Sequence, residues 1–466
     1  MLRRLPILLL LVAPLAHGQG VMQSLTIQGL ERQDLTTIRA RGMGATFAAT
    51  AGSPESILLN PASLASLSRP ALSAGGLWLS RDWAETQHWN PNRYYAGLSL
   101  FFSDPEDYRS EPLLEPDWTH SQQNFQLATL GGAIPISIAD RRFTAGLMLH
   151  QVAQLGDYDR NDNVLDPYIG QFRPDPIERP KPGEEIEVQW SAFERERNGQ
   201  IQALSAAAGF ELLKSLYVGI RISRSWGNST DRQYIRQIGM FALREDAHDY
   251  SHTVTEGLTN WNGSSDYSGW SRAIGILWQH QILSAGITYQ LPSHVTRTFS
   301  LNGQVEISES GSTNFSLAGE DKIRLPARVV AGIALRPIAS VVLAADYFLQ
   351  NYETLDISGT GQESAPDWGK IQGIGLGMEW KLRGTTLVRA GFRHDPQPFR
   401  IEGFGLIGKT ATGDAFSVGL GQDLTLVTVD VAYEFQRLRY QDRWESNVDY
   451  NRIRKHNVLF GVTYSF

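Results

Sequence analysis

Very few residues of this sequence have the types and the spacing that chemistry requires. The run Gly403-Phe404-Gly405-Leu406-Ile407-Gly408-Lys409-Thr410 superficially matches a phosphate-binding loop. Such a loop needs a strand-to-helix turn within a βαβ unit, whereas this run falls in a long connection between extended segments. We therefore do not assign it to nucleotide binding.

The histidines do not form the pattern of a hydrolase. His150, His280 and His394 stand singly near the ends of extended segments, and the sequence has no Gly-x-Ser-x-Gly run. A Ser-His-Asp mechanism needs all three groups together at one rim. We therefore predict histidines in a lumen or at a bilayer interface, no catalytic residue and no cofactor, and we do not expect an enzyme.

One acidic run invites comparison with a calcium-binding loop. Asp157, Asp159 and Asn161 occupy the first, third and fifth positions of such a loop. However, Asp162 stands where the loop needs glycine, and the twelfth position is Tyr168 instead of glutamate. A solvated external loop is the default interpretation and we predict no metal site, although surface calcium binding stays open.

Composition excludes several classes of protein. Among 466 residues, 42 Lys and Arg oppose 49 Asp and Glu, and this net charge of −7 argues against nucleic acid as a partner. The absence of cysteine excludes disulfides, thiolate metal sites, cysteine catalysis and a lipidated N-terminus. Mean hydropathy is −0.25, too polar for a bundle of membrane helices. The 44 glycines and many aromatic residues favour a β-rich chain.

The N-terminus has the features of a secretory signal peptide. Arg3 and Arg4 precede an apolar run over residues 5–15, and small residues follow at 16–18. A transmembrane anchor would need about 20 apolar residues, and this run is too short. We predict a signal peptide over residues 1–18 and an exported mature chain.

Strict two-residue alternation recurs along the rest of the chain. In the last segment Val458, Phe460, Val462, Tyr464 and Phe466 share one apolar face, and small or polar residues share the other. In a soluble sandwich the charged face would meet water outside, whereas in a membrane barrel it meets the lumen. The same alternation occurs over residues 341–349, 374–380 and 427–435, with Asp346, Glu379, Asp430 and Glu434 opposite the apolar face.

Connection lengths favour the membrane barrel. Short turns and long polar connections alternate, which predicts an all-β, transmembrane antiparallel β-barrel of about 14 strands over residues 71–466. Two further alternating segments, 93–102 and 294–307, are predicted to be strands within the long connections. The short turns follow residues 138, 212, 280, 336, 382 and 421; the long connections are approximately 81–123, 153–199, 227–269, 292–322, 352–368, 396–412 and 439–454.

Aromatic residues mark the ends of the predicted strands. The chain ends on Phe466, in phase with Tyr464, and bacterial outer-membrane barrels typically end in this way because their assembly machinery recognises the terminal strand. These two residues are therefore the predicted assembly signal, and the barrel assembly machinery is a predicted partner. Tryptophans near strand ends predict an aromatic girdle at the bilayer interface: Trp78, Trp83, Trp226, Trp278 and Trp380.

Residues 19–70 lack alternation and are rich in small residues. This segment contains the run Arg39-Ala40-Arg41-Gly42-Met43-Gly44-Ala45 and the triplet Asn60-Pro61-Ala62. Both resemble motifs of the N-terminal region of the FadL family of outer-membrane transporters. Looser resemblance continues at 325–328, 344–347 and 389–392, and at the final aromatic residue. Ser63 departs from the pattern, because relatives commonly carry glycine there.

The resemblance implies a hatch over residues 19–70 that plugs a 14-stranded barrel. It also implies passive uptake of long-chain fatty acids or aromatic hydrocarbons across the bacterial outer membrane by a monomer surrounded by lipid. The implied hatch motif is Gly42, Met43, Gly44, Asn60, Pro61 and Ala62. Physically, Pro61 fixes φ and biases Asn60 away from helix, and the glycines permit close packing inside a crowded lumen.

Several interpretations stay open at this stage. Inward apolar residues such as Val330, Phe348 and Leu387 could line substrate pockets or simply pack against a hatch, and the glycine row 373–377 leaves lumen space. The rival function is that of a PorV-like outer-membrane barrel in protein secretion or assembly, which shares the N-terminal motifs and would co-purify with translocon or cargo proteins.

Overall fold

The computed structural model describes residues 29–30, 37–50, 52–89, 115–138, 141–166, 183, 185–244, 258–307, 311–359, 368–382, 384–400, 410–444 and 447–466. The predicted signal peptide, the segment 93–102 and residues 403–409 lie outside these ranges. No helix in the described ranges is long and apolar enough to span a bilayer.

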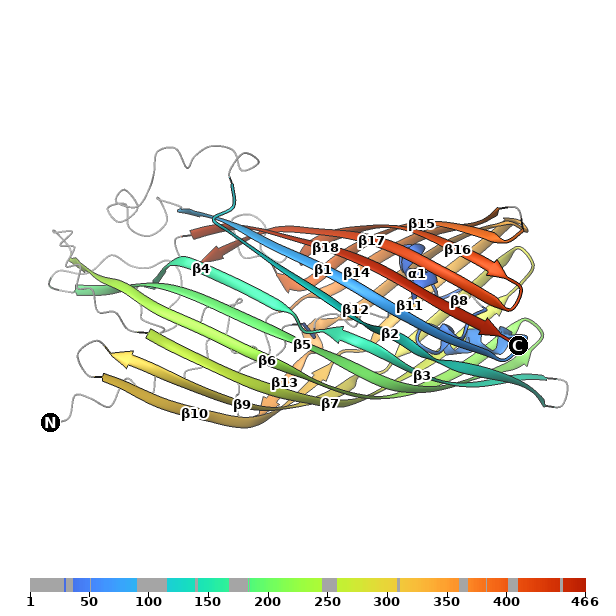
Figure 1. Cartoon of the computed structure of the whole chain (residues 1–466), viewed down its shortest axis with the longest axis horizontal. Coiled ribbons are helices and arrows are strands. Elements are labelled where there is room, and N and C mark those ends of the chain that lie inside the picture. Colours follow the sequence, from blue (N-terminus) through green and yellow to red (C-terminus); the bar gives the residue numbers. More distant parts are fainter. Residues whose placement is uncertain are drawn as a thin grey trace.

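The described strands form one closed antiparallel sheet (Figure 1). Closure comes from β1, which pairs with β2 on one side and with the C-terminal β18 on the other. The strands are β1 Ala71–Trp89, β2 Trp118–Ile138, β3 Arg141–Gln154, β4 Asp157–Asp166, β5 Glu185–Leu213, β6 Leu216–Arg244, β7 Leu258–Gln279, β8 Leu283–Gln290, β9 Ser293–Ile307, β10 Gly311–Leu325, β11 Arg328–Ile338, β12 Val341–Asn351, β13 Asp356–Gly359, β14 Lys370–Leu382, β15 Thr386–Arg400, β16 Thr410–Leu424, β17 Val427–Trp444 and β18 Asn447–Ser465.

These 18 segments make 14 barrel strands, as the sequence predicts. Four strands are each interrupted once, so that two segments follow one another in the same place in the wall: β3 with β4, β8 with β9, β10 with β11 and β12 with β13. For example, β7 pairs first with β8 and then with β9. The even count follows because each hairpin adds two antiparallel strands.

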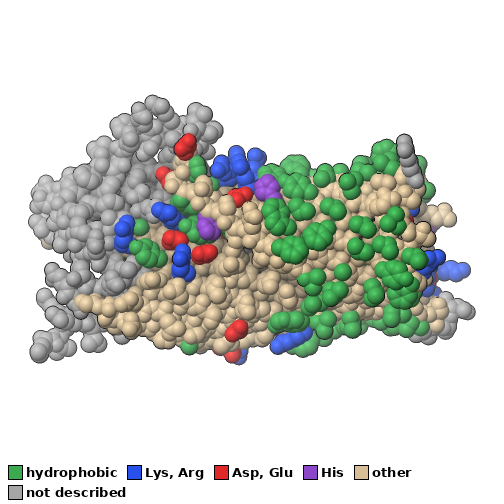
Figure 2. All heavy atoms as spheres, viewed as in Figure 1, with side chains coloured by type: hydrophobic (Ala, Val, Ile, Leu, Met, Phe, Trp, Pro, Cys, Tyr) green, Lys and Arg blue, Asp and Glu red, His purple; other side chains and the backbone are tan. Residues whose placement is uncertain are grey.

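The predicted two-residue alternation is confirmed by the exposure of the side chains. Phe460, Val462 and Tyr464 face outward on β18, whereas Leu459, directly before Phe460, is fully buried in the lumen. Figure 2 shows hydrophobic side chains gathered over the half of the barrel that holds the C-terminus. Because this apolar belt covers the outside of a closed sheet, the molecule is a transmembrane β-barrel.

Most of the predicted long connections are wrong as loops, because the strands continue through them. Residues 294–307 form a strand, β9, as predicted, but β9 belongs to the wall because it pairs with both β7 and β10. Likewise Asp157–Asp166 is β4, paired with β5, so this run is extended and cannot wrap a calcium ion. The physical reason is that backbone pairing continues above the belt, where the outward side chains are polar and the apolar alternation fades.

Five of the six short turns lie within two residues of where they are expected, and the last lies three residues later, at Thr425-Leu426. The tryptophan girdle is confirmed for Trp226, Trp278 and Trp380, which face outward. It is wrong for Trp83, which is buried. Odd-numbered residues of β1 face the lumen, so Trp83 shares a side with Leu77 and Leu79.

A charge at the middle of the belt should destabilise the barrel more than the same charge at its rim. Val418 and Leu424 on β16 are equally exposed, at 57% and 56%. We expect Val418→Arg to lower the free energy of unfolding by about 2–4 kcal/mol and Leu424→Arg by about 0–1 kcal/mol. Denaturant titrations in lipid vesicles measure both. Equal effects would contradict the placement of the belt.

Candidate functional site

Residues 37–67, here called the inner segment, fold inside the barrel. They form α1 Ile38–Gly42 and two 3-10 helices, η1 Pro54–Ile57 and η2 Pro61–Ser66. Both 3-10 helices begin at proline, whose fixed φ and missing N–H suit the first position of a helix. The segment contacts both sides of the barrel, α1 against β15, β16 and β17, and η2 against β5, β6 and β7.

Asn60 holds the inner segment to itself and to the wall. Its side-chain oxygen accepts from the N–H of Ala62 at 3.1 Å, capping η2. Its amide nitrogen donates to the carbonyls of Ala48 at 2.7 Å and of Ile276, on β7, at 3.2 Å. The side chain is completely buried. One asparagine therefore joins two turns of the inner segment and one barrel strand.

Glycines of the wall make room for this contact. A Cβ on Gly275 would lie 2.1 Å from Oδ1 of Asn60, and a Cβ on Gly286 would lie 1.8 Å from the carbonyl oxygen of Ala48. Within the inner segment, Gly44 has a φ of +65° and packs directly on the backbone of Phe392. The missing side chains therefore allow backbone-to-backbone packing between plug and wall.

The inward glycine row 373–377 leaves space in the lumen, as predicted, and this space is filled. Cβ atoms on Gly375 and Gly377 would collide with the carbonyl oxygens of Gly44 and Met43. A Cβ on Gly373 would instead meet the ring of Phe348. The space that the glycines create is occupied by the inner segment and by an aromatic side chain.

Ion pairs join the inner segment to the inward carboxylates of the wall. Arg39 binds Glu379 through two hydrogen bonds of 2.9 and 2.8 Å, and Arg41 pairs with the fully buried Glu434. Wall arginines complete the network: Arg389 lies 2.8 Å from Glu379, and Arg393 lies 3.1 Å from Glu434. Charges buried in this way require partners, and here the plug and the wall supply them to each other.

Asp346 makes a third polar attachment. Its Oδ2 accepts hydrogen bonds from the backbone N–H groups of Phe47, at 2.7 Å, and Ala48, at 2.8 Å. An ionised carboxylate that accepts two backbone hydrogen bonds forms stronger bonds than a neutral acceptor would. Asp346 therefore orients the turn that follows Gly44.

The structure brings all six predicted motif residues together in the inner segment. Gly42 and Met43 lie at the end of α1 and Gly44 directly follows, while Asn60, Pro61 and Ala62 begin η2, and all six are buried or nearly so. Arg39 and Arg41 were missed as site residues. Their signal was the set of four carboxylates predicted to face the lumen, which need cationic partners there.

The predicted terminal signal lies at the opposite face of the wall. The rings of Tyr464 and Phe466 stack outside the barrel, with centroids 5.5 Å apart. The backbone N–H of Phe466 donates to the carbonyl of Pro70 at 3.0 Å, which ties the last residue to the start of β1. Recognition by assembly machinery stays a prediction.

The histidines match their predicted structural places. His150 is buried and lies 2.8 Å from Oγ of Ser205 through Nε2, while Nδ1 faces the carbonyl of Gln151 instead of a carboxylate. His394 contacts the exposed Asp414, and His280 stacks on Trp278 near a short turn. No group of three potential metal ligands occurs in the part of the chain that the structure describes.

The wall is interrupted between β2 and the end of β3. Backbone pairing of β2 with β3 stops at Thr129 and His150, and in the described ranges β4 pairs only with β5. Both strands are irregular at this level. Ala128 is skipped in the pairing of β2 with β1, and Val152 is skipped in the pairing of β3 with β5. We call this interruption the wall break.

Side chains replace the missing backbone bonds across the wall break. Gln126 donates to Gln151 and accepts from Gln154 at 2.8 Å, while Arg81 reaches the carbonyl of Gly156. Farther out, the ring of Tyr158 stacks on His120 at 3.8 Å. Burial raises the pKa of Tyr158 to about 12. Rotatable side chains therefore close a gap that a rigid ladder closes elsewhere.

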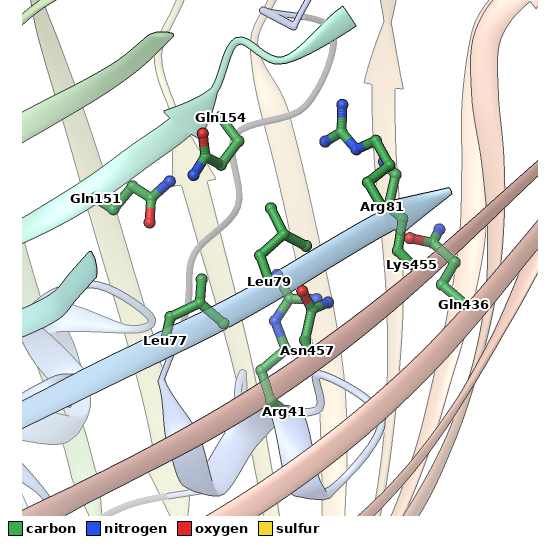
Figure 3. A pocket seen from close by; sticks show the side chains of 9 residues that line it. All are labelled: Arg41, Leu77, Leu79, Arg81, Gln151, Gln154, Gln436, Lys455 and Asn457. Carbon is green, nitrogen blue, oxygen red and sulfur yellow. The ribbon is translucent and has the colours of Figure 1, made fainter. Parts of the chain in front are cut away.

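A small cavity lies on the lumen side of the wall break (Figure 3). Gln151 and Gln154 face it from β3, Leu77 and Leu79 from β1, and Arg41 reaches it from the inner segment. Polar ends of Arg81, Gln436, Lys455 and Asn457 complete the lining. The cavity thus joins the plug, the wall break and a mixed polar and apolar surface.

An apolar cluster fills the lumen beside the wall break. It includes Ala153 and Leu155 at the break itself and Leu30 from the N-terminal side of the inner segment. Its other buried members are Ile201, Tyr267, Val295, Ile323, Leu325, Tyr352, Leu355, Trp368 and Ile371. Of the inward apolar residues predicted from the sequence, Val330 packs against the inner segment, Phe348 joins both groups and Leu387 is half-buried.

These features define a class: a transmembrane barrel with an internally folded N-terminal segment and an interrupted wall. No protein-family model matches the sequence, and no curated protein matches it. Solved structures do match. The Pseudomonas putida toluene transporter TodX aligns over 92% of this chain and 97% of its own, with 14% identity and a TM-score of 0.58.

Two further structures agree. A Pseudomonas aeruginosa FadL homologue aligns over 92% of this chain and 98% of its own, with 12% identity and a TM-score of 0.59. The Ralstonia pickettii toluene transporter TbuX aligns over 92% of this chain and 98% of its own, with 14% identity and a TM-score of 0.54. The predicted resemblance to the FadL family is confirmed at the level of the fold.

Replacing Asn60 with alanine should loosen the inner segment. The change leaves two buried carbonyls without their donor and removes the cap of η2. We expect it to lower the free energy of unfolding by about 1–3 kcal/mol. We expect Asn60→Ala to raise the leakage of small polar solutes through the barrel in planar bilayers. Ser66→Ala, which removes a hydrogen bond within η2 alone, is the control. Unchanged leakage in Asn60→Ala would contradict a plugging role.

Removing the charge of the Glu379 carboxylate should lower the free energy of unfolding far more than removing the charge of a surface carboxylate. Glu379→Gln leaves the charges of Arg39 and Arg389 short of a partner inside the barrel, and we expect a loss of about 3–5 kcal/mol. Asp423→Asn breaks an exposed contact with Lys381 at 3.5 Å and should cost about 0–1 kcal/mol. Urea unfolding in detergent compares the two variants. Similar unfolding midpoints would contradict a stabilising role for the buried ion-pair network around Glu379.

Proposed function

We propose that the protein is an outer-membrane channel for the passive uptake of hydrophobic small molecules. The observation that carries this proposal is the wall break, which lies beside a buried apolar cluster. A water-filled pore offers nothing to a solute whose exposure to water costs roughly 25 cal/mol per Å² of apolar surface. A route from an apolar lumen through the wall to the bilayer avoids that exposure.

The exposed residues at the edge of the wall break support this route. Phe125 and Leu127 lie on the β2 edge and face outward, at 65% and 41% exposure, so the break begins within the apolar belt. On the lumen side, Ala153 and Leu155 belong to the apolar cluster. A hydrophobic solute leaving that cluster would meet hydrocarbon as soon as Gln126, Gln151 and Gln154 rotate aside.

A channel of this kind must also be closed to water along the barrel axis, and the inner segment supplies this closure. We propose that residues 37–67 act as a hatch that prevents free passage of water and polar solutes along the barrel axis. Three separate attachments support this role: Asn60 with its three hydrogen bonds, the two arginine–carboxylate pairs, and Asp346 on the backbone of Phe47 and Ala48.

The solved structures agree with a hydrophobic substrate. TodX and TbuX are described as toluene transporters, and a further match of TM-score 0.53 and 13% identity, CymD, as a monoaromatic hydrocarbon channel. The lining of the cavity behind the break also carries Arg41, Arg81 and Lys455. Aromatic hydrocarbons and long-chain fatty acids are therefore the two substrate classes to compare.

Locking the wall break should stop uptake. The chain has no cysteine, so Gln126→Cys with Gln151→Cys provides two unique thiols across the break. We expect a short bismaleimide to lower the uptake of labelled toluene or oleate by cells carrying this variant to the level of cells without the protein. The control is Ala203→Cys with Ser225→Cys, two lumen-facing positions opposed on the intact ladder of β5 and β6.

Two outcomes would count against these proposals separately. Full uptake after cross-linking of the break would refute the lateral route and leave the transport function standing. Equal uptake by cells with and without the unmodified protein, across a broad panel of hydrophobic compounds, would refute the transport function. In that case, co-purification of translocon or cargo proteins would support the secretion role.

A further inference from the structure

Four arginines stand together on the outside of β17 and β18, and nothing in the proposed transport route uses them. Arg437 lies directly opposite Arg454, and Arg439 lies directly opposite Arg452. We call these four residues the arginine patch. Three of them are exposed and Arg452 is half-buried. Arg452 is close enough to Arg439 and Arg454 for their charges to interact.

Like charges in direct cross-strand pairs destabilise a sheet. The patch contains two such pairs, one after the other along the same hairpin. None of the four arginines forms an ion pair within the described part of the chain. Two carboxylates lie opposite members of the patch: Asp414 opposite Arg437, where it contacts His394 at 3.0 Å, and Asp82 opposite Arg454, where it accepts from Ser121 at 2.6 Å. Four arginines against two carboxylates leave the patch with a net positive charge that an external anion would neutralise.

The depth of the patch identifies where that anion would lie. Arg454 is ten residues from Tyr464 along β18, and at a tilt of about 40° ten residues rise about 26 Å, the height of the apolar belt. Between belt and patch lies an aromatic layer, in which Tyr433 bonds His456 at 2.8 Å and Phe435 packs on the same ring. Figure 2 shows Lys or Arg side chains beside a histidine at this edge of the belt.

The patch lies toward the long-loop end of the barrel, away from the short turns. In bacterial barrels the long loops are extracellular and the short turns periplasmic, so the patch lies at the surface of the outer leaflet. Arginine is the side chain best suited to phosphate, because its planar fork donates two parallel hydrogen bonds. Below the patch, Val458, Phe460 and Tyr433 offer an apolar surface to acyl chains.

We infer that the arginine patch binds a phosphorylated glycolipid of the outer leaflet, with the phosphates between the four guanidinium groups and the acyl chains on the aromatic belt below. The bound phosphate would neutralise the repulsion between the two arginine pairs, so lipid and hairpin stabilise each other. The inference rests on the outer-membrane location proposed above and does not depend on transport.

Native mass spectrometry of the detergent-purified full chain tests this site with bisphosphorylated lipid A. We expect Arg437→Gln with Arg454→Gln to lose about tenfold in affinity, which corresponds to about 1.4 kcal/mol. Arg437→Lys with Arg454→Lys should keep part of the affinity, because charge remains without the planar fork. The control is Arg224→Gln with Arg236→Gln, two exposed arginines of β6 that face no arginine across the sheet, and it should bind like the unmodified chain.

The lipid is distinguished from a simple anion by two further arms. Lipid A without its phosphates should not bind, and millimolar inorganic phosphate should not displace the bisphosphorylated form. Unchanged binding in the Gln variant, or equal loss in the β6 control, would overturn the site; displacement by inorganic phosphate would overturn the lipid as its ligand. Heat-modifiable gel mobility verifies that each variant is folded.

Discussion

Hydrocarbon provides no hydrogen-bond partner for a peptide group, and the molecule is organised around this constraint. A strand in lipid must pair along both edges, so β1 has to meet β18 and close the sheet. Closure then fixes which residues face lipid and which face the lumen. The outer face becomes uniformly apolar over the height of the bilayer, and charged residues of the spanning strands are directed inward.

The enclosed lumen creates the need for the inner segment. Glu379, Asp346 and Glu434 are buried where they have little access to water, and each binds a group from residues 37–67. Conversely, Arg39 and Arg41 of the inner segment pair with carboxylates of the wall. The glycines of the wall leave space for the backbone of the inner segment. Plug and wall are therefore one interior, built from polar contacts that neither part could satisfy alone.

The wall break is where this constraint is relaxed. Hydrogen bonds between glutamine side chains, and one from Arg81 to the carbonyl of Gly156, span the break in place of a backbone ladder. These few side-chain bonds cost less to separate than a run of consecutive backbone bonds. A break in this position, between an apolar lumen and the bilayer, is where a hydrophobic solute would leave the barrel sideways. The arginine patch, on the hairpin of β17 and β18, faces outward and concerns the lipid around the barrel.

The sequence alone determined the class of fold, the strand count and the outward and inward faces. These follow from alternation of period two and from turn chemistry, which are local. The residues of the inner motif came from the resemblance to the FadL family. The sequence-based prediction failed where pairing decides: strands continue through polar segments that lack apolar alternation, as in β4 and β10, and Trp83 faces the lumen because of its place in β1. The contact of Arg39 with Glu379 joins residues 340 positions apart, and the break depends on irregularities in two strands meeting at one height. Only the closed sheet brings such residues together, because register between strands is a property of the assembled barrel.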